Sequence, residues 1–290
     1  MIQHILISMR LPQWIKNFFL FAAILFAGHL GNINDILLVL KGFFIFSITS
    51  SGVYLLNDIA DAKNDRIHPV KKYRPIASGE LSALNALLAA LVLFGIGISF
   101  AFYLHTQFAG ICLLYISLNI LYSNYTKHFV ILDVMSIATG FVLRVVAGAM
   151  LINVPTSVWL LICTFLLSLF LGFVKRRHEI TTLNMSAENH RKVLEQYSVP
   201  FLDQMVGIVT ACTVIAYSLY TISEETVRKF QTTHLIYTIP FVLFGIFRYL
   251  YLVHKQDFGG NPTKVIFSDY QLFLNIVLWI LASVYIIYIH

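Results

Sequence analysis

The amino-acid sequence predicts an all-α, multi-pass membrane protein, a bundle of nine transmembrane helices, on three observations. The 290 residues are 58% hydrophobic and 12% charged, whereas about a quarter of the residues of a soluble domain are charged. The mean hydropathy is +0.78, so folding in water would leave much apolar surface unburied. The apolar residues also gather in runs that approach the roughly 20 residues needed to cross a bilayer as a helix.

The apolar runs follow one another along the whole chain, and no long linker separates them. Each run is expected to be a helix, because an isolated strand cannot satisfy its backbone hydrogen bonds in lipid. The first run is short and follows Pro12 and Trp14, which are typical of a segment at the membrane interface. The expected spans are 16–30, 36–58, 82–104, 107–125, 130–152, 156–174, 200–222, 234–254 and 269–289. We therefore expect a single transmembrane domain over residues 1–290.

Lysine and arginine are distributed unequally between alternate connecting segments. One set of segments is rich in them, notably 63–74 and 175–177, whereas the opposite set holds only Lys41, Arg228 and Lys229. Cytoplasmic loops carry the excess of positive residues in membrane proteins. The pattern predicts an inner (cytoplasmic) membrane protein with a cytoplasmic N-terminus and an external C-terminus. This topology accounts for most of the net charge of +6, so we expect no nucleic-acid partner.

Three carboxylates stand at the cytoplasmic end of the second run, in the stretch 57–65. Steps of three and four residues place Asp58, Asp61 and Asp65 on one face of a helix. Because like charges on one face repel, a cation is expected to hold them, and Mg²⁺ bound to a substrate phosphate is the usual solution. The pattern predicts these aspartates as metal ligands and catalytic residues for chemistry on a phosphorylated substrate at the membrane surface.

The loop that follows supplies positive side chains. Arg66, Lys71 and Arg74 lie among two prolines and a glycine that define its turns. These cations are candidates for binding the phosphate oxygens that the metal leaves free. The alternative is a role in membrane orientation alone, which does not explain the carboxylates.

A second group of polar residues surrounds the start of the fifth run. Tyr122 and Lys127 can reach a phosphate near the cytoplasmic mouth, and Asp133 lies where an isolated carboxylate is costly unless it is paired or metal-bound. The alternative for this group is interfacial anchoring with a helix-start aspartate. Deeper in the same run, Arg144 is either a functional residue or a structural charge that snorkels or pairs with a buried polar group.

A third group follows the sixth run and contains Lys175, Arg176, Arg177 and Glu179. Consecutive cations suit a phosphate-rich ligand. A basic stop-transfer cluster at a helix end is the alternative.

The motif NDxxDxxxD at 57–65, with the His-Pro…Arg-Pro-Ile-Ala-Ser-Gly loop at 68–79, resembles the UbiA superfamily of intramembrane prenyltransferases. The resemblance implies a helical bundle around a cavity open to the cytosol and to lipid. It also implies that Asn57 and the three aspartates hold Mg²⁺-diphosphate. Most members carry a second aspartate-rich motif near the sixth helix, whereas residues 175–179 here read Lys-Arg-Arg-His-Glu.

One branch of the superfamily, the decaprenyl-phosphate phosphoribosyltransferases, is similar over nearly the whole chain. The similar segments include 10–17, 122–127, 132–133, 140–148 and 175–179. This resemblance implies Mg²⁺-dependent transfer of 5-phosphoribose from 5-phosphoribosyl 1-diphosphate to a decaprenyl-like polyprenyl phosphate, with release of diphosphate. Lys16, in the first of these segments, is then expected to bind substrate.

Two other functions are compatible with the sequence. A UbiA-type prenyltransferase would move a prenyl group from its diphosphate to an aromatic acceptor, but the inverted charge at 175–179 favours an anionic second substrate. A cation transporter is suggested by Asp58, Asp133 and Arg144, yet the charges concentrate at one face rather than the midplane. Lipid-facing and partner-facing apolar surfaces look alike, so the sequence leaves a homo-oligomer open.

Overall fold

The computed structural model describes residues 1–183, 192–256, 260 and 262–289. Within these residues the regular elements are all helices and no strand occurs, which confirms the all-α prediction. The chain divides into two compact units, residues 1–156 with 186–195 and residues 157–185 with 196–290. The single domain expected over residues 1–290 stays a prediction.

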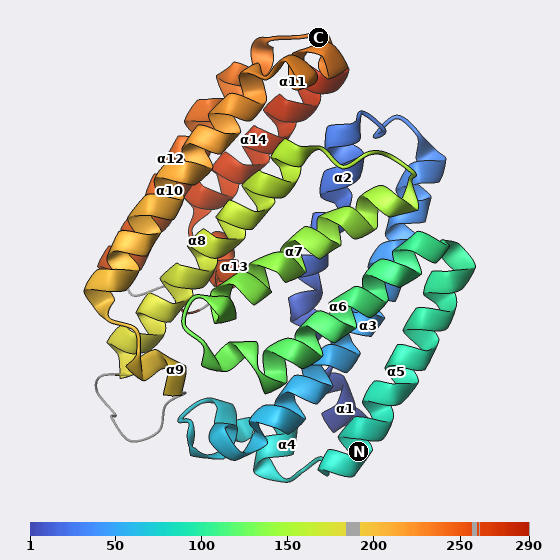
Figure 1. Ribbon diagram of the computed structural model, residues 1–290, viewed down its shortest axis with the longest axis vertical. Helices are drawn as coiled ribbons and strands as arrows, with labels where there is room; N and C mark the ends of the chain where they lie inside the picture. Colours follow the sequence, from blue (N-terminus) through green and yellow to red (C-terminus); the bar gives the residue numbers. More distant parts are fainter. Residues whose placement is uncertain (184–191, 257–259, 261, 290) are drawn as a thin grey trace. The chain divides into compact units, whose positions relative to one another are not determined.

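The first unit is built on four long helices, of which α3 packs along α5 and α6 packs along α7 (Figure 1). The short helix α2 packs against α7. In chain order the elements are α1 (Ile2–Ser8), the 3₁₀ helix η1 (Leu11–Phe19), α2 (Leu20–Ala27), α3 (Ile33–Ile67), η2 (Lys71–Tyr73), α4 (Pro75–Ser78), α5 (Ala83–Leu104), α6 (Thr106–Asn124), η3 (Thr126–His128), α7 (Leu132–Leu151) and α9 (Lys192–Glu195).

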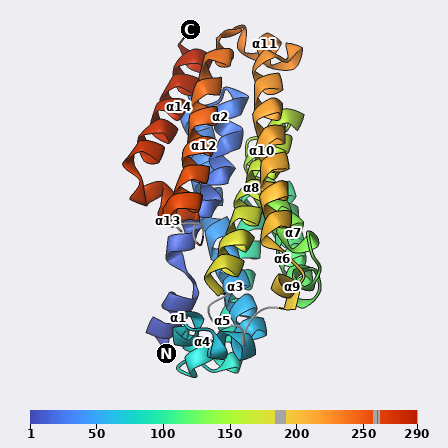
Figure 2. The same cartoon turned by 90° about the vertical axis from the view of Figure 1, so that its left-hand side faces the viewer.

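The second unit contains four further long helices, in which α8 packs along α10 and α12 packs along α14 (Figure 2). Its elements are α8 (Val158–Leu183), α10 (Val199–Ile222), α11 (Glu224–Phe230), η4 (His234–Thr238), α12 (Ile239–Gln256), α13 (Pro262–Ser268) and α14 (Tyr270–Tyr288).

Eight helical segments of the described chain are long and apolar enough to cross a membrane. They correspond to the last eight predicted spans, so the protein is an integral membrane protein. The first predicted span, 16–30, is instead divided between η1 and the eight-residue α2, and Gly28 ends α2 with a left-handed φ of +85°. The predicted count of nine is therefore not confirmed.

Local sequence explains where several helices begin and end. Ser82 caps α5 by accepting a hydrogen bond from the Asn85 backbone N–H at 3.2 Å, a common way to satisfy a first-turn donor. The longest helix, α3, stops at Ile67, because the residue before a proline is disfavoured in helical geometry and His68 precedes Pro69. This boundary places the aspartates on helix and the basic residues in the loop.

Small residues allow the helices of the first unit to approach closely. An ideal Cβ placed on Gly148 of α7 would lie 2.0 Å from the backbone carbonyl oxygen of Leu20 in α2. At Gly97 of α5, a Cβ would lie 2.4 Å from the Thr49 hydroxyl of α3. Close approach through small residues is typical of membrane helices, whose association gains little from the hydrophobic effect.

Substituting Gly148 by alanine is expected to destabilise the first unit, because backbone atoms must move to admit the methyl group. Overpacking of this kind costs about 1–3 kcal/mol or more. The matched control is Gly110→Ala in α6, where the added Cβ meets nothing within 4 Å. Thermal unfolding in detergent should show a lower Tm for Gly148→Ala and no decrease for Gly110→Ala. Equal Tm values for the two variants would contradict the close contact between Gly148 and the backbone of Leu20.

Candidate functional site

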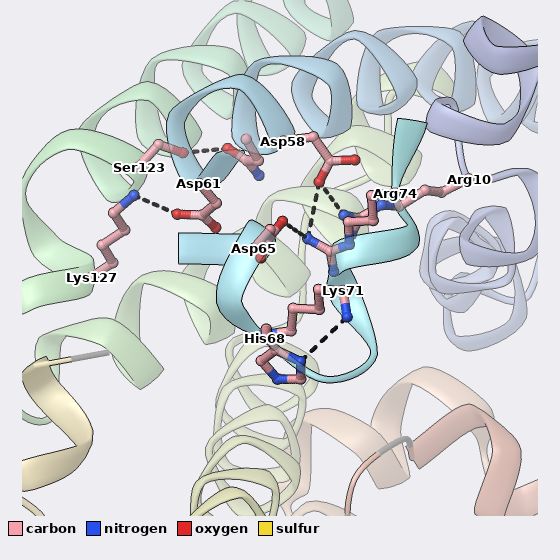
Figure 3. A network of polar contacts seen from close by, with 10 residues as sticks. Arg10, Asp58, Asp61, Asp65, His68, Lys71, Arg74, Ser123 and Lys127 are labelled. Atoms are coloured by element: carbon pink, nitrogen blue, oxygen red, sulfur yellow. Dashed lines mark hydrogen bonds and ion pairs between the residues drawn. The ribbon is translucent and has the colours of Figure 1, made fainter. Parts of the chain in front are cut away.

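The three aspartates lie near the C-terminal end of α3 (Figure 3). The predicted span ended at residue 58, but the helix runs on to Ile67, so Asp58, Asp61 and Asp65 follow one another over about two turns. Asp58 and Asp65 are 3% and 4% exposed. Because a buried carboxylate is costly unless its charge is compensated, the partners of these side chains define the site.

Two arginines from distant parts of the sequence bind the first aspartate. Arg10, at the turn between α1 and η1, donates through Nη2 to Oδ1 of Asp58. Arg74, which precedes α4, donates through Nη1 to the same oxygen at 3.1 Å and to Oδ2 of Asp65 at 2.5 Å. Burial lowers the pKa of the Arg10 guanidinium and Asp58 opposes the shift. One nitrogen atom of Arg74 thus bridges two carboxylates.

The segment after α6 supplies the partners of the second aspartate and of Asn57. Lys127 of η3, itself buried, donates through Nζ to Oδ1 of Asp61 at 2.8 Å. The hydroxyl of Ser123, on the last turn of α6, donates to Oδ1 of Asn57. These two contacts join α6 and η3 to the aspartate-bearing turn of α3.

Other loop residues shape the backbone around the carboxylates. Arg66 donates through Nε to the carbonyl of Ala77 at 3.2 Å, which ties the end of α3 to α4. The Nδ1 atom of His68 accepts the backbone N–H of Lys71 at 3.3 Å (Figure 3). Arg66 and His68 therefore hold the loop that presents Arg74.

The N-terminal segment, residues 9–17, lies along α3 and is joined to it by side-chain hydrogen bonds. The bonds are those of Asn17 Nδ2 with Ser47 Oγ (2.9 Å) and Ser50 Oγ (3.2 Å), of Trp14 Nε1 with Ser51 Oγ (2.9 Å), and of Ser51 Oγ with the carbonyl of Met9 (3.0 Å). These contacts fix the segment that carries Arg10.

Arg144 of α7 lies in the interior of the first unit at 4% exposure. It donates to Asn17 Oδ1 at 2.8 Å, to the carbonyl of Gly140 at 2.7 Å and to the Tyr115 hydroxyl at 2.9 Å. Its guanidinium carbon also lies 4.8–5.4 Å from the ring centroids of Phe46, Tyr115 and Phe141. Of the alternatives raised by the sequence, pairing with buried polar groups is confirmed, and cation–π contacts add to it.

Comparison with known proteins decides the family. A profile of the UbiA prenyltransferase family matches residues 17–277. The chain belongs to this family. The UbiA resemblance expected from residues 57–65 and 68–79 is thereby confirmed.

Relatives of this UbiA chain are found both in sequence and in structure. The decaprenyl-phosphate phosphoribosyltransferase of Corynebacterium glutamicum is 32% identical over 97% of this chain and 86% of that protein. The protein of the same name from Mycolicibacterium smegmatis is 28% identical over 94% of this chain and 89% of its own. Among solved structures, a UbiA homologue from Archaeoglobus fulgidus bound to GPP and Mg²⁺ has a TM-score of 0.73, with 17% identity, over 98% of this chain and 99% of that chain. The structural likeness establishes the UbiA fold.

The aspartate face of this UbiA chain fits a divalent cation in the chemistry of its ligands, since Mg²⁺ prefers carboxylate oxygen atoms. A single cationic nitrogen of Arg74 already bridges Asp58 and Asp65, so one cation can contact both. Asp61 is held by Lys127 instead. Across the described residues, no group of three or more His, Cys, Asp or Glu side chains is gathered closely enough to hold an ion. Arginine and lysine side chains compensate the charges of these carboxylates.

The remaining predicted residues of the first unit are placed as follows. Lys16 lies in η1, Tyr122 near the end of α6, and Asp133 in the first turn of α7, where it is buried. Their roles in substrate binding, like those of Arg66 and Lys71, stay predictions.

The third predicted group lies in the second unit, on the last turns of α8. Arg176 donates through Nη1 to Oε2 of Glu179 at 2.5 Å, and Lys175 Nζ lies 3.9 Å from Oε1 of the same carboxylate. Arg177 donates to Oδ1 of Asp203 on α10. Glu179 and Asp203 therefore compensate part of the positive charge of this group. The sequence had predicted that this charge binds a ligand.

Sequence reasoning did not identify Arg10 or Ser123 as site residues. Arg10 was one of many positive residues on the expected cytoplasmic side, and the signal that could have separated it is its place in segment 10–17, one of the segments that carry the resemblance to the phosphoribosyltransferase branch. Ser123 likewise stands in a polar stretch, 122–128, whose other members are equally able to form hydrogen bonds.

Proposed function

We propose that this protein transfers 5-phosphoribose from 5-phosphoribosyl 1-diphosphate to the phosphate of a decaprenyl-like polyprenyl phosphate, releasing diphosphate. The observation that carries the proposal is that relatives named decaprenyl-phosphate phosphoribosyltransferase align with 94–97% of the chain. We also propose an inner-membrane location, with the N-terminus and the aspartate site cytoplasmic and the C-terminus external. The distribution of lysine and arginine supports this orientation.

In this reaction a phosphate oxygen of the lipid attacks C1 of the ribose, and the bond from C1 to the diphosphate oxygen breaks. Negative charge grows on the departing diphosphate, so cations placed beforehand around it lower the barrier. Arg10, Arg74 and Lys127 form ion pairs with the three aspartates, and so they are cations of this kind. The acceptor is already an anion at neutral pH, so the reaction needs no strong general base.

We also propose that the reaction depends on Mg²⁺. When bound, it would neutralise the diphosphate leaving group, and Asp58, Asp61 and Asp65 would hold it. Arg74 lies beside Asp58 and Asp65, and its guanidinium is proposed to bind phosphate oxygen atoms there. Asn57, Lys16, Arg66, Lys71 and Tyr122 are proposed to complete the substrate contacts, together with Asp133.

The deciding experiment supplies the purified protein with 5-phosphoribosyl 1-diphosphate labelled in the ribose, polyprenyl phosphate and Mg²⁺. Label that enters the organic phase, and that is lost when a chelator is added, is the expected result. Absence of transfer, with activity on a prenyl diphosphate and an aromatic acid in the same preparation, would assign ordinary prenyl transfer. Substrate flux into vesicles without any chemical product would assign transport.

The basic group on α8 is proposed to bind one of the anionic substrates. Replacing Arg176 and Arg177 together by glutamine is expected to raise the KM for a phosphorylated substrate about tenfold or more, because a hydrogen bond to a charged group contributes roughly 1.5–3 kcal/mol. The matched control is the double replacement of Arg228 and Lys229 by glutamine, on the opposite side by the proposed topology. An unchanged KM accompanied by altered membrane orientation would instead assign the group to topology.

A further inference from the structure

A second polar cluster lies in the first unit, away from the aspartates. Ser47 precedes Asp58 by eleven residues of α3, which is about 16 Å along a helix axis. At the level of Ser47, Arg144 meets Asn17, and the hydrogen bonds of Arg144 within the described residues go to neutral oxygen atoms. Within the described residues, the hydrogen bonds of Arg144 therefore join it to the N-terminal segment, α6 and α7 and not to the aspartates.

We propose that Arg144 is a positioning residue, which acts through Asn17 to fix segment 9–17 on α3 and so places the Arg10 guanidinium against Asp58. The inference deepens the proposed function, and only the kinetic part of its test rests on that function.

The side chain of Asn17 is the first link. Its Oδ1 accepts from Arg144, while its Nδ2 donates to Ser47 and Ser50. Arg144 has only donors to offer, so it requires the oxygen of the amide to face α7 and the nitrogen to face α3. Asn17 is 1% exposed, so its amide depends on these protein partners for its hydrogen bonds. Loss of the guanidinium therefore leaves the orientation of the amide undetermined and loosens its contacts with α3.

The second link runs from Asn17 to Arg10. One turn earlier, Trp14 donates to Ser51, and the Ser51 hydroxyl donates in turn to the carbonyl of Met9, directly before Arg10. Hydrogen bonds to Ser51 therefore hold the turn at Arg10 on both sides, through Met9 before it and Trp14 after it.

The backbone conformation of Arg10 shows why these hydrogen bonds are needed. Arg10 adopts φ +53° and ψ +51°, a left-handed conformation that a residue with a Cβ adopts only when its surroundings impose it. When the hydrogen bonds on one side of Arg10 are lost, the turn relaxes toward an unstrained conformation. The guanidinium then leaves Oδ1 of Asp58.

The test uses Trp14 as a reporter in protein free of metal and substrate. Trp159→Phe and Trp279→Phe leave Trp14 as the single tryptophan of the three in the chain. In this background, Arg144→Met is expected to shift the emission of Trp14 to longer wavelength. It is also expected to speed tryptic cleavage after Arg10 about tenfold or more, since cleavage requires local opening of the segment. The matched control is Arg248→Met, which removes another arginine of a membrane span, one that binds Asp269 at 2.6 Å in the second unit. It should change neither signal.

A lower Tm for Arg144→Met, with unchanged Trp14 emission and unchanged cleavage after Arg10, would assign Arg144 a purely structural role and overturn the proposal. If Arg144→Met does not fold, Asn17→Leu provides the same comparison. Leucine has a similar size but lacks the amide that joins Arg144 to Ser47 and Ser50, so this variant should release the segment as well. Retention of segment 9–17 in Asn17→Leu would overturn the proposal.

The kinetic part is a double-mutant cycle with Arg10→Met. If Arg144 acts through Arg10, Arg144→Met should raise the KM of the diphosphate donor in the wild-type background and add little in the Arg10→Met background. Additive effects would overturn the coupling. If the protein does not transfer phosphoribose, the fluorescence and cleavage results still stand, because neither involves substrate.

Discussion

Asp58→Asn is expected to abolish phosphoribosyl transfer while leaving the protein folded. Asparagine has nearly the same shape, and its Oδ1 can still accept hydrogen bonds from Arg10 and Arg74, so the local packing should persist. The substitution removes the negative charge that a metal–diphosphate complex needs. We expect a rate decrease of roughly 10³-fold, because a metal ion contributes several kcal/mol of charge stabilisation in the transition state.

The measurement is label transfer to the lipid phase, accompanied by a melting curve. Asp35→Asn is the matched control, since Asp35 is an aspartate of the same helix that pairs with His29 at 2.7 Å, far from the site in sequence. It should retain transfer. Asp65→Asn should behave like Asp58→Asn, because Arg74 joins the two carboxylates. Normal turnover in either of the two site variants would exclude the proposed metal role.

Arg74→Met is expected to make the stability of the protein depend on Mg²⁺. Its Nη1 atom compensates the buried carboxylates of Asp58 and Asp65, and removal of one partner from a fully buried ion pair costs about 3–5 kcal/mol, an upper bound here because the Arg74 side chain is 27% exposed. The variant should therefore melt several degrees lower than the wild type without metal. Magnesium should restore more stability to the variant than to the wild type, because the ion no longer competes with the guanidinium.

Melting temperatures with and without Mg²⁺ provide the comparison. Arg66→Met is the control, because Arg66 lies in the same stretch but donates to the carbonyl of Ala77 rather than to an aspartate. It should show the metal response of the wild type. Equal stabilisation of Arg74→Met and wild type by Mg²⁺ would show that the metal does not occupy the place of the Arg74 guanidinium.

The aspartate site depends on residues outside the motif that identifies it. The compensating cations come from the turn before η1, from the loop before α4 and from η3, which are separated by long stretches of sequence. Each contributes one side chain to the last turns of α3. Variants at Arg10 or Lys127 should therefore affect the same site as variants at the aspartates, although neither residue belongs to the aspartate motif.

The sequence by itself determined the helical class, eight of the spans and the aspartate face, because each depends on local periodicity. A run of about 20 apolar residues becomes a helix in lipid wherever it occurs, and steps of three and four residues align carboxylates on any helix. Arg74 and Lys127 were also predicted as site residues, since each lies in a short basic segment that follows a span. Their specific partners, Asp58 with Asp65 and Asp61, were not.

Only the tertiary structure decided how the charges are paired. Arg10 contacts Asp58 while Trp14 and Asn17 join the N-terminal segment to α3, and the predicted first span is divided between η1 and α2. Arg177 is compensated by Asp203 of another helix. These contacts join residues far apart in the sequence, and no local pattern encodes them, since a buried charge is satisfied by whichever donor or acceptor the packing of the helices brings within reach.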